Sequence, residues 1–122
     1  MAIPIINLKR AFQPASADDG WRILVDRLWP RGINKDRAAI KLWYKVIAPS
    51  IELRKSFGHE VEKWPDFRQK YKQELRANKV ALEELLNVVR QHPVITLVYA
   101  AKDEEHNNAV VLKEVLTNLL KK

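Results

Sequence analysis

Two patterns of apolar residues alternate along the chain and predict strands separated by helices. Residues 3–12, 21–28 and 94–101 are short and mostly apolar, as is typical of buried β-strands. Residues 64–90 and 105–120 repeat apolar side chains every three or four positions, which predicts amphipathic helices. This order predicts an α/β fold: one three-layer domain over residues 1–122, with a small, mostly parallel sheet of about three or four strands flanked by helices.

Turn and capping residues set the boundaries of the helices. Ser50 follows a proline and can cap a helix that Gly58 ends. The long periodic stretch, residues 64–90, can divide into two helices at Asn78. Residues 32–43 have no sustained periodicity, so we expect an irregular connection with at most one helical turn.

The composition excludes several classes of protein. A chain of 122 residues with 47% apolar and 30% charged residues is large enough for one core and is not globally disordered. The absence of cysteine excludes disulfides, thiolate zinc sites and a cysteine nucleophile. Neither a signal peptide nor a run of membrane-spanning length is present, so we expect a cytoplasmic protein without a membrane partner.

The net charge of +7 attracts partners that carry phosphate or carboxylate groups. The basic residues are spread along the chain and form no tail. An anionic small molecule is therefore favoured over a nucleic acid, and a basic surface that only aids solubility stays an alternative. The sequence leaves the oligomeric state open.

The segment RILVDRLWPRG, residues 22–32, is the most informative part of the chain because an apolar strand runs directly into charged and aromatic residues. Ligands of parallel sheets bind beyond the carboxyl ends of the strands. We therefore expect three segments to meet at one edge of the sheet: residues 9–10, where Arg10 closes the first strand, residues 26–32 and residues 99–107.

The first cluster of candidates belongs to this segment. Asp26 is a candidate general base, while the forked guanidinium groups of Arg27 and Arg31 suit a phosphate or carboxylate. Trp29 offers a ring on which a ligand can stack. The alternative is that Asp26 and Arg27 form a structural ion pair that fixes the loop.

Lys45, Ser50, Arg54 and His59 form a second cluster. Ser50 opens a helix and Arg54 lies one turn further on the same face, which is the pattern of a phosphate cradle. An ordinary helix cap beside a surface arginine explains the same spacing. His59 is a candidate general acid, or simply a loop residue after a helix-ending glycine.

The third cluster follows the last predicted strand and contains Lys102, Asp103 and Asn107. These residues can bind a ligand or activate water, but they can also cap the helix that follows. His106 and the carboxylates around it match no metal-binding spacing, so we expect neither a metal nor a cofactor. With three glycines, the chain contains no dinucleotide-binding fingerprint, phosphate-binding loop or nucleophile elbow.

Several motifs in a fixed order resemble one family. They are ILVDRLWPRG, W-x-K-x-I-A-P-S from Trp43, E-L-R from Glu52, W-x-x-F-x-x-x-Y-x-x-E-L from Trp64 and L-V-Y-A-A-K-D from Leu97. Over residues 9–120 the chain resembles the bacterial family of domain of unknown function 488, in its short YeaO-like branch. The resemblance implies a compact α/β domain and no particular activity. It also implies that the following residues match family motif positions: Arg10, Asp26, Arg27, Trp29, Arg31, Lys45, Ser50, Arg54, His59, Lys102 and Asn107.

The chain departs from the family pattern in two places. Val46 stands where the family commonly has an acidic residue, so a catalytic base at that position would be missing here. Longer relatives often carry a cysteine-histidine-arginine run after the last strand, where this chain has KDEEHNN. Thiol chemistry is therefore not carried over.

Three hypotheses remain open from the sequence. The first is an enzyme that acts on an anionic or phosphorylated small molecule, with Asp26 or Asp103 as base and His59 or Lys102 as acid. Its substrate- or anion-binding residues would be Arg10, Arg27, Trp29, Arg31, Lys45, Ser50, Arg54 and Asn107. The second is a module that binds a nucleotide or nucleic acid without catalysis, using the same arginines with Trp29, Trp43 and Trp64. The third is a protein whose charged motif is purely structural.

Overall fold

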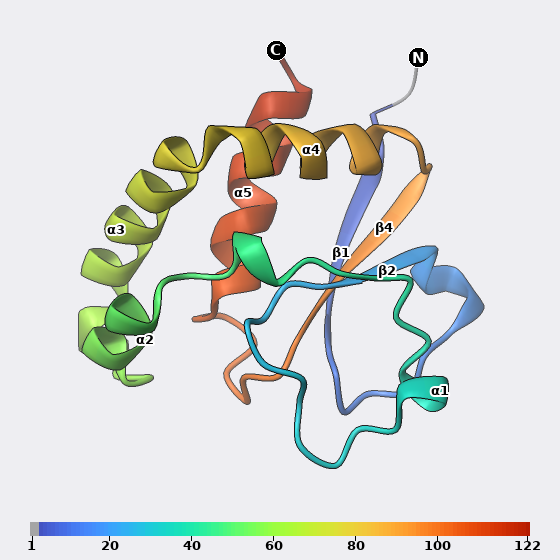
Figure 1. Cartoon of the computed structure of the whole chain (residues 1–122), viewed down its shortest axis with the longest axis horizontal. Helices are drawn as coiled ribbons and strands as arrows, with labels where there is room; N and C mark the ends of the chain where they lie inside the picture. Colours follow the sequence, from blue (N-terminus) through green and yellow to red (C-terminus); the bar gives the residue numbers. More distant parts are fainter. Residues whose placement is uncertain (1–2) are drawn as a thin grey trace.

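Three of the apolar runs form the strands of one parallel sheet, as the sequence predicts. The computed structural model describes residues 3–122 (Figure 1). The sheet has four strands in the order β1-β4-β2-β3. They are β1 (Ile5–Arg10), β2 (Trp21–Leu24), β3 (Leu42–Trp43) and β4 (Val94–Tyr99). The predicted α/β class and small parallel sheet are confirmed.

Five α-helices accompany the strands in the described part of the chain. They are α1 (Lys35–Ala38), α2 (Ile51–Phe57), α3 (Trp64–Ala77), α4 (Lys79–Arg90) and α5 (Asn108–Leu120). Ser50 caps α2 and Gly58 ends it with φ of 55°, so both predicted boundaries are confirmed. The predicted division at Asn78 is also observed, and the Asn78 side chain donates a hydrogen bond to the Val46 carbonyl at 3.1 Å.

All strand pairs are parallel, so the carboxyl ends of the strands lie at one edge of the sheet. β4 is central and pairs with β1 on one side and β2 on the other. β2 is shorter than predicted: Val25 still donates to the Val98 carbonyl at 3.1 Å, but from Asp26 the chain leaves the sheet. β3 lies in the connection expected to be irregular, and its two residues pair with Ile23 and Leu24.

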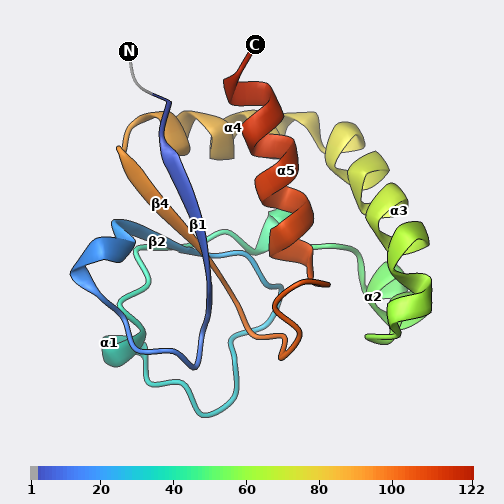
Figure 2. The same ribbon diagram turned by 180° about the vertical axis from the view of Figure 1, so that it is seen from behind.

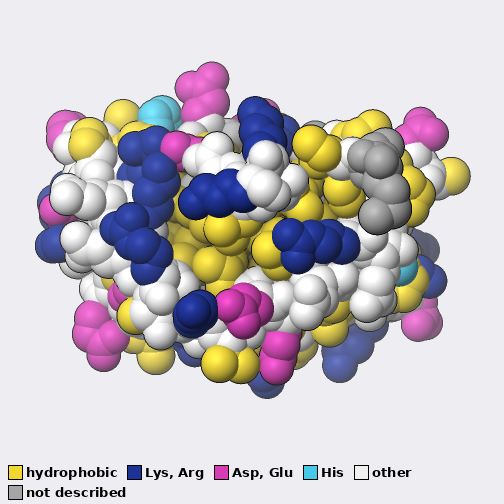
Figure 3. All heavy atoms as spheres, turned by 90° about the horizontal axis from the view of Figure 1, so that it is seen from above, with side chains coloured by type: hydrophobic (Ala, Val, Ile, Leu, Met, Phe, Trp, Pro, Cys, Tyr) yellow, Lys and Arg dark blue, Asp and Glu magenta, His cyan; other side chains and the backbone are white. Residues whose placement is uncertain are grey.

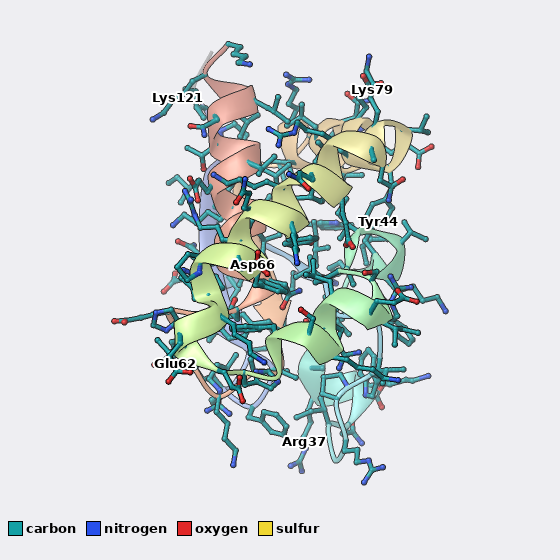
Figure 4. All side chains as sticks on the ribbon, turned by 90° about the vertical axis from the view of Figure 1, so that its left-hand side faces the viewer. Arg37, Tyr44, Glu62, Asp66, Lys79 and Lys121 are labelled. Atoms are coloured by element: carbon teal, nitrogen blue, oxygen red, sulfur yellow. The ribbon has the colours of Figure 1, made fainter. Side chains whose placement is uncertain are left out.

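The two faces of the sheet are covered differently. On one face, side chains of β2 and β4 pack with α2, α3, α4 and α5 in the main core. α5 runs along β1 and β4 when the molecule is seen from behind (Figure 2). α3 lies between α2 and α5 (Figure 4), and Glu114 of α5 accepts hydrogen bonds from Arg68 and Lys72 of α3.

The connection between β2 and β3, including α1, covers the other face (Figure 1). Leu24 and Val98 point to this side because strand side chains alternate. Next to them lies a polar network centred on Asp19, which bonds to Lys9 at 3.1 Å and to Arg22 at 2.6 Å. Thr96 of β4 donates to the Asp19 carbonyl at 2.7 Å. This network ties the turn before β2 to the sheet.

Candidate functional site

A cavity of about 460 Å³ lies at the carboxyl ends of β2 and β4. The segment after β2, the loop after β4, the start of α5 and one face of α2 form its walls. The charged and polar residues among its lining are Asp26, Arg27, Arg31, Arg54, Lys55, His59, Asn107 and Asn108, and the aromatic ones are Trp29, Phe57 and Phe67.

The cavity is strongly basic. Arg27, Arg31, Arg54 and Lys55 line it, against the single carboxylate of Asp26. Arg31, Arg54 and Lys55 are exposed and lie at its rim, whereas Asp26 is half-buried. An uneven distribution of this kind produces a positive potential at the mouth of the cavity.

Asp26 is held by the backbone and by α5. Its Oδ2 accepts a hydrogen bond from the Ala100 N–H at 2.9 Å, and its Oδ1 accepts one from Asn108 Nδ2 at 3.2 Å. Burial raises the pKa of Asp26; these two hydrogen bonds and the charges of Arg54 and His59 offset the rise only in part. Asp26 is therefore a carboxyl group whose ionised form is disfavoured in the free protein.

Arg27 turns away from Asp26, although the two are adjacent in the sequence. Its Nη2 donates to the carbonyls of Ala48 and Pro49 at 3.2 and 3.3 Å, just before α2. Its Nε is buried and has no hydrogen-bond partner within residues 3–122. Within the same residues, no ion pair joins Asp26 to Arg27.

The loop after Arg27 is fixed by its tryptophan. Trp29 Nε1 donates to the Ile33 carbonyl at 2.9 Å, and the Trp29 ring meets the Trp43 ring edge-on with centroids 5.7 Å apart. Trp43 Nε1 in turn donates to the Asp26 carbonyl at 2.8 Å. These contacts leave Arg31 exposed at the rim of the cavity.

Of the second predicted cluster, the structure brings only Arg54 and His59 to the cavity. Ser50 accepts from the Leu53 N–H, and its own hydroxyl donates to Glu74 of α3 at 2.6 Å. Ser50 thus caps α2, docks it on α3, and lines a separate cavity of about 180 Å³. Lys45 lies over the Trp43 ring, 4.7 Å from its centroid.

His59 follows Gly58 in the left-handed region, with φ of 59°. A residue with a Cβ is strained there by about 1–2 kcal/mol. This turn carries His59 back from the end of α2 to the cavity. The sequence suggested the residue but not its unusual backbone.

The third cluster is also divided. Asn107 caps α5 by accepting from the Val110 N–H, and it lines the cavity. Lys102 and Asp103 do not line it. Asp103 caps the turn before α5 by accepting hydrogen bonds from the backbone N–H groups of Glu105 and His106. These hydrogen bonds, the one from Glu105 first, lower the pKa of Asp103. Arg10 donates from Nε to the Ala101 carbonyl at 3.0 Å and so supports the loop from outside.

Sequence reasoning missed Asn108 and Lys55. Asn108 Nδ2 donates to the Val25 carbonyl at 3.1 Å as well as to Asp26. A second asparagine directly after a helix cap was the only signal for it, and only the fold shows that it faces the end of β2.

Across residues 3–122, no group of three or more His, Cys, Asp or Glu side chains gathers as a metal site. In the same range, no helix is long and apolar enough to cross a membrane.

Comparisons with known proteins agree with the resemblance inferred from the motifs. The family described as "Inactive DUF488-N3 subclade" matches residues 5–122. The chain is 45% identical to Uncharacterized protein YeaO of Escherichia coli (strain K12) over 114 residues, which cover 93% of this chain and 98% of that protein. It is 37% identical to Uncharacterized protein Rv3073c of Mycobacterium tuberculosis (strain ATCC 25618 / H37Rv) over 111 residues, which cover 91% and 92%. No solved structure matches.

Proposed function

The chain belongs to the DUF488 family, in the subclade described as inactive, and we propose that it binds a small anionic ligand without catalysing a reaction. One observation carries the proposal: four cationic side chains and one carboxylate that forms no ion pair within residues 3–122 line a single cavity at the strand ends. The volume of about 460 Å³ falls within the range of about 300–1,000 Å³ usual for small-molecule sites.

The chemistry of the walls favours an anion that also has an apolar part. Guanidinium groups bind phosphate and carboxylate through paired hydrogen bonds and stay charged at every physiological pH. Arg27 has a buried Nε without a partner in the described chain, which leaves one donor unsatisfied. The rings of Trp29, Phe57 and Phe67 supply apolar wall.

The arrangement offers less support for catalysis. Asp26 and His59 share the cavity, but Lys102 and Asp103 lie outside its lining. No hydrogen bond links Asp26 to His59 within the described residues. The description of the subclade as inactive agrees with a binding role.

A nucleic acid is the less favoured ligand because the basic residues outside the cavity are dispersed and form no continuous stripe with it. Figure 3 shows Lys and Arg side chains around an apolar depression at the end of the molecule that carries α4, seen from above. This dispersed charge agrees with the spread of basic residues along the chain. Measurements of binding must therefore separate the cavity from the general basicity of the protein.

The test is isothermal titration calorimetry of the full chain with inorganic phosphate and phenyl phosphate at 50 and 200 mM salt. We expect binding that Arg54→Ala and Arg27→Ala each weaken about tenfold or more. Arg90→Ala is the control, because α4 ends before the amino end of β4, opposite the cavity. Equal losses in Arg90→Ala and Arg54→Ala, or no binding by either phosphate, would refute the proposal.

A further inference from the structure

The carboxylate of Asp26 has hydrogen-bonding capacity left over. An ionised carboxylate has about four lone-pair positions. The Ala100 N–H and Asn108 Nδ2 occupy two of them, and no other donor within residues 3–122 reaches the group. Since Asp26 also lines the cavity, the unoccupied positions are available to a ligand.

A carboxylate in this place is a disadvantage for a site that binds only an anion. It partly cancels the attraction of Arg27, Arg31 and Arg54 for a negative group. Burial also disfavours its ionised form, as the raised pKa of Asp26 indicates. The nearby arginines do not relieve this cost by ion pairing, since Arg27 donates to backbone carbonyls and Arg54 remains exposed.

The cavity is therefore polarised from its floor to its rim. Asp26 lies inside, between the ends of β2 and β4 and the start of α5. Arg31, Arg54 and Lys55 lie outside and are exposed. A ligand that carries charges of both signs can satisfy the two regions together.

We propose that the cavity selects ligands that carry an amino group together with a phosphate or carboxylate, and that Asp26 is the residue that selects for the amino group. The ammonium group lies against Asp26 Oδ1 and Oδ2, and the anionic group faces the arginines. This inference rests on the proposed function and narrows it to zwitterionic ligands. Asn108 and the Ala100 N–H act as positioning groups that hold the carboxylate toward the cavity.

Matched probes test the selection. We would titrate the full chain with phenylalanine and 3-phenylpropanoate, and with O-phosphoethanolamine and ethyl phosphate; the members of each pair differ by one amino group. The wild type should bind the amino member of at least one pair about tenfold or more tightly, the usual gain from a charged hydrogen bond. Asp26→Asn should abolish this preference and retain or improve binding of the member without the amino group.

The controls separate this inference from the proposed function. Arg54→Ala should weaken both members of a pair equally and leave the preference intact. A wild type that binds both members equally, or an Asp26→Asn variant that keeps the preference, overturns the inference and leaves the anion site standing. The inference is also overturned, and the anion site retained, if the protein binds inorganic phosphate but neither phenylalanine nor O-phosphoethanolamine. If no probe binds, phosphate included, both proposals fail.

A measurement on the wild type covers the case in which Asp26→Asn does not fold. For taurine and ethanesulfonate, which differ by one amino group and whose sulfonates stay ionised throughout, the ratio of affinities measured from pH 8 down to pH 4 should fall as Asp26 takes up a proton. The carboxylate and the ammonium then no longer attract each other, while the arginines remain charged. A ratio that stays constant over this range would overturn the inference.

Discussion

Asn108 donates one hydrogen bond to the carboxylate of Asp26, at 3.2 Å, across 82 positions of the sequence. The same Nδ2 donates to the Val25 carbonyl at 3.1 Å. The first residue of α5 therefore holds the end of β2 beside the cavity, which Asp26 and Asn108 both line.

Asn108→Ala should destabilise the protein by about 1–3 kcal/mol, because the Val25 carbonyl loses a partner in a largely buried place. Chemical denaturation monitored by circular dichroism measures the change. Asn118→Ala is the matched control, since Asn118 is exposed on the same helix, and it should change stability by less than about 0.5 kcal/mol. Equal effects of the two substitutions would show that Asn108 has no special role.

Asp26→Asn should change how stability depends on pH. Burial raises the pKa of Asp26 in the folded protein. The protonated side chain therefore makes its full contribution to stability below the unfolded pKa near 3.8, and this contribution is lost as the pH rises through the folded pKa. The Asp26→Asn variant has no carboxyl group at this position and so does not lose this stability as the pH rises. Its stability relative to wild type should therefore increase between pH 4 and pH 8, measured by denaturation at each pH. A difference that stays flat, or that decreases with pH, would contradict the raised pKa.

Asp19→Ala should cost about 3–5 kcal/mol, because it leaves the guanidinium of Arg22, 3% exposed, without its partner. Asp18→Ala, on an exposed neighbouring residue, is the control and should cost far less. Burial by itself raises the pKa of Asp19, but the Ser16 N–H, Lys9 and Arg22 lower it overall. The stability that Asp19 contributes is therefore lost only as pH falls below about 3.8, the ordinary value for aspartate. A small effect of Asp19→Ala at pH 7 would show that Arg22 finds another partner.

Gly20→Ala should destabilise the fold by at least about 3 kcal/mol. Gly20 has φ of 63°, and an added Cβ would lie 2.3 Å from the Val94 carbonyl oxygen at the start of β4. Gly32→Ala offers a comparison with φ of 78° and open space around the new methyl group, so only the backbone strain of about 1–2 kcal/mol applies. Thermal denaturation of both variants checks the order, and similar losses would mean that contact with Val94 is not the cause.

Local patterns were sufficient wherever a structural choice depends on neighbours along the chain. Ser50 and Gly58 bound α2 because capping involves groups within one helical turn. Asn78 separates α3 from α4 at the predicted position, but its side chain donates to the distant Val46 carbonyl and does not cap α4. The two residues of β3 could not be predicted, because pairing with Ile23 and Leu24 creates the strand and no run of apolar residues marks it.

The sequence by itself determined the α/β class, the main helices, the parallel pair β2 and β4, and the edge of the sheet where chemistry-bearing residues gather. These follow from periodicity and from the rule that parallel strands end at one edge. Only the tertiary structure decided which candidates face the cavity. It directs Arg27 to the carbonyls before α2, assigns Ser50 to Glu74, and brings Asn108 to Asp26. Such contacts depend on how separate elements pack, and the spacing of residues along one segment carries no record of that packing.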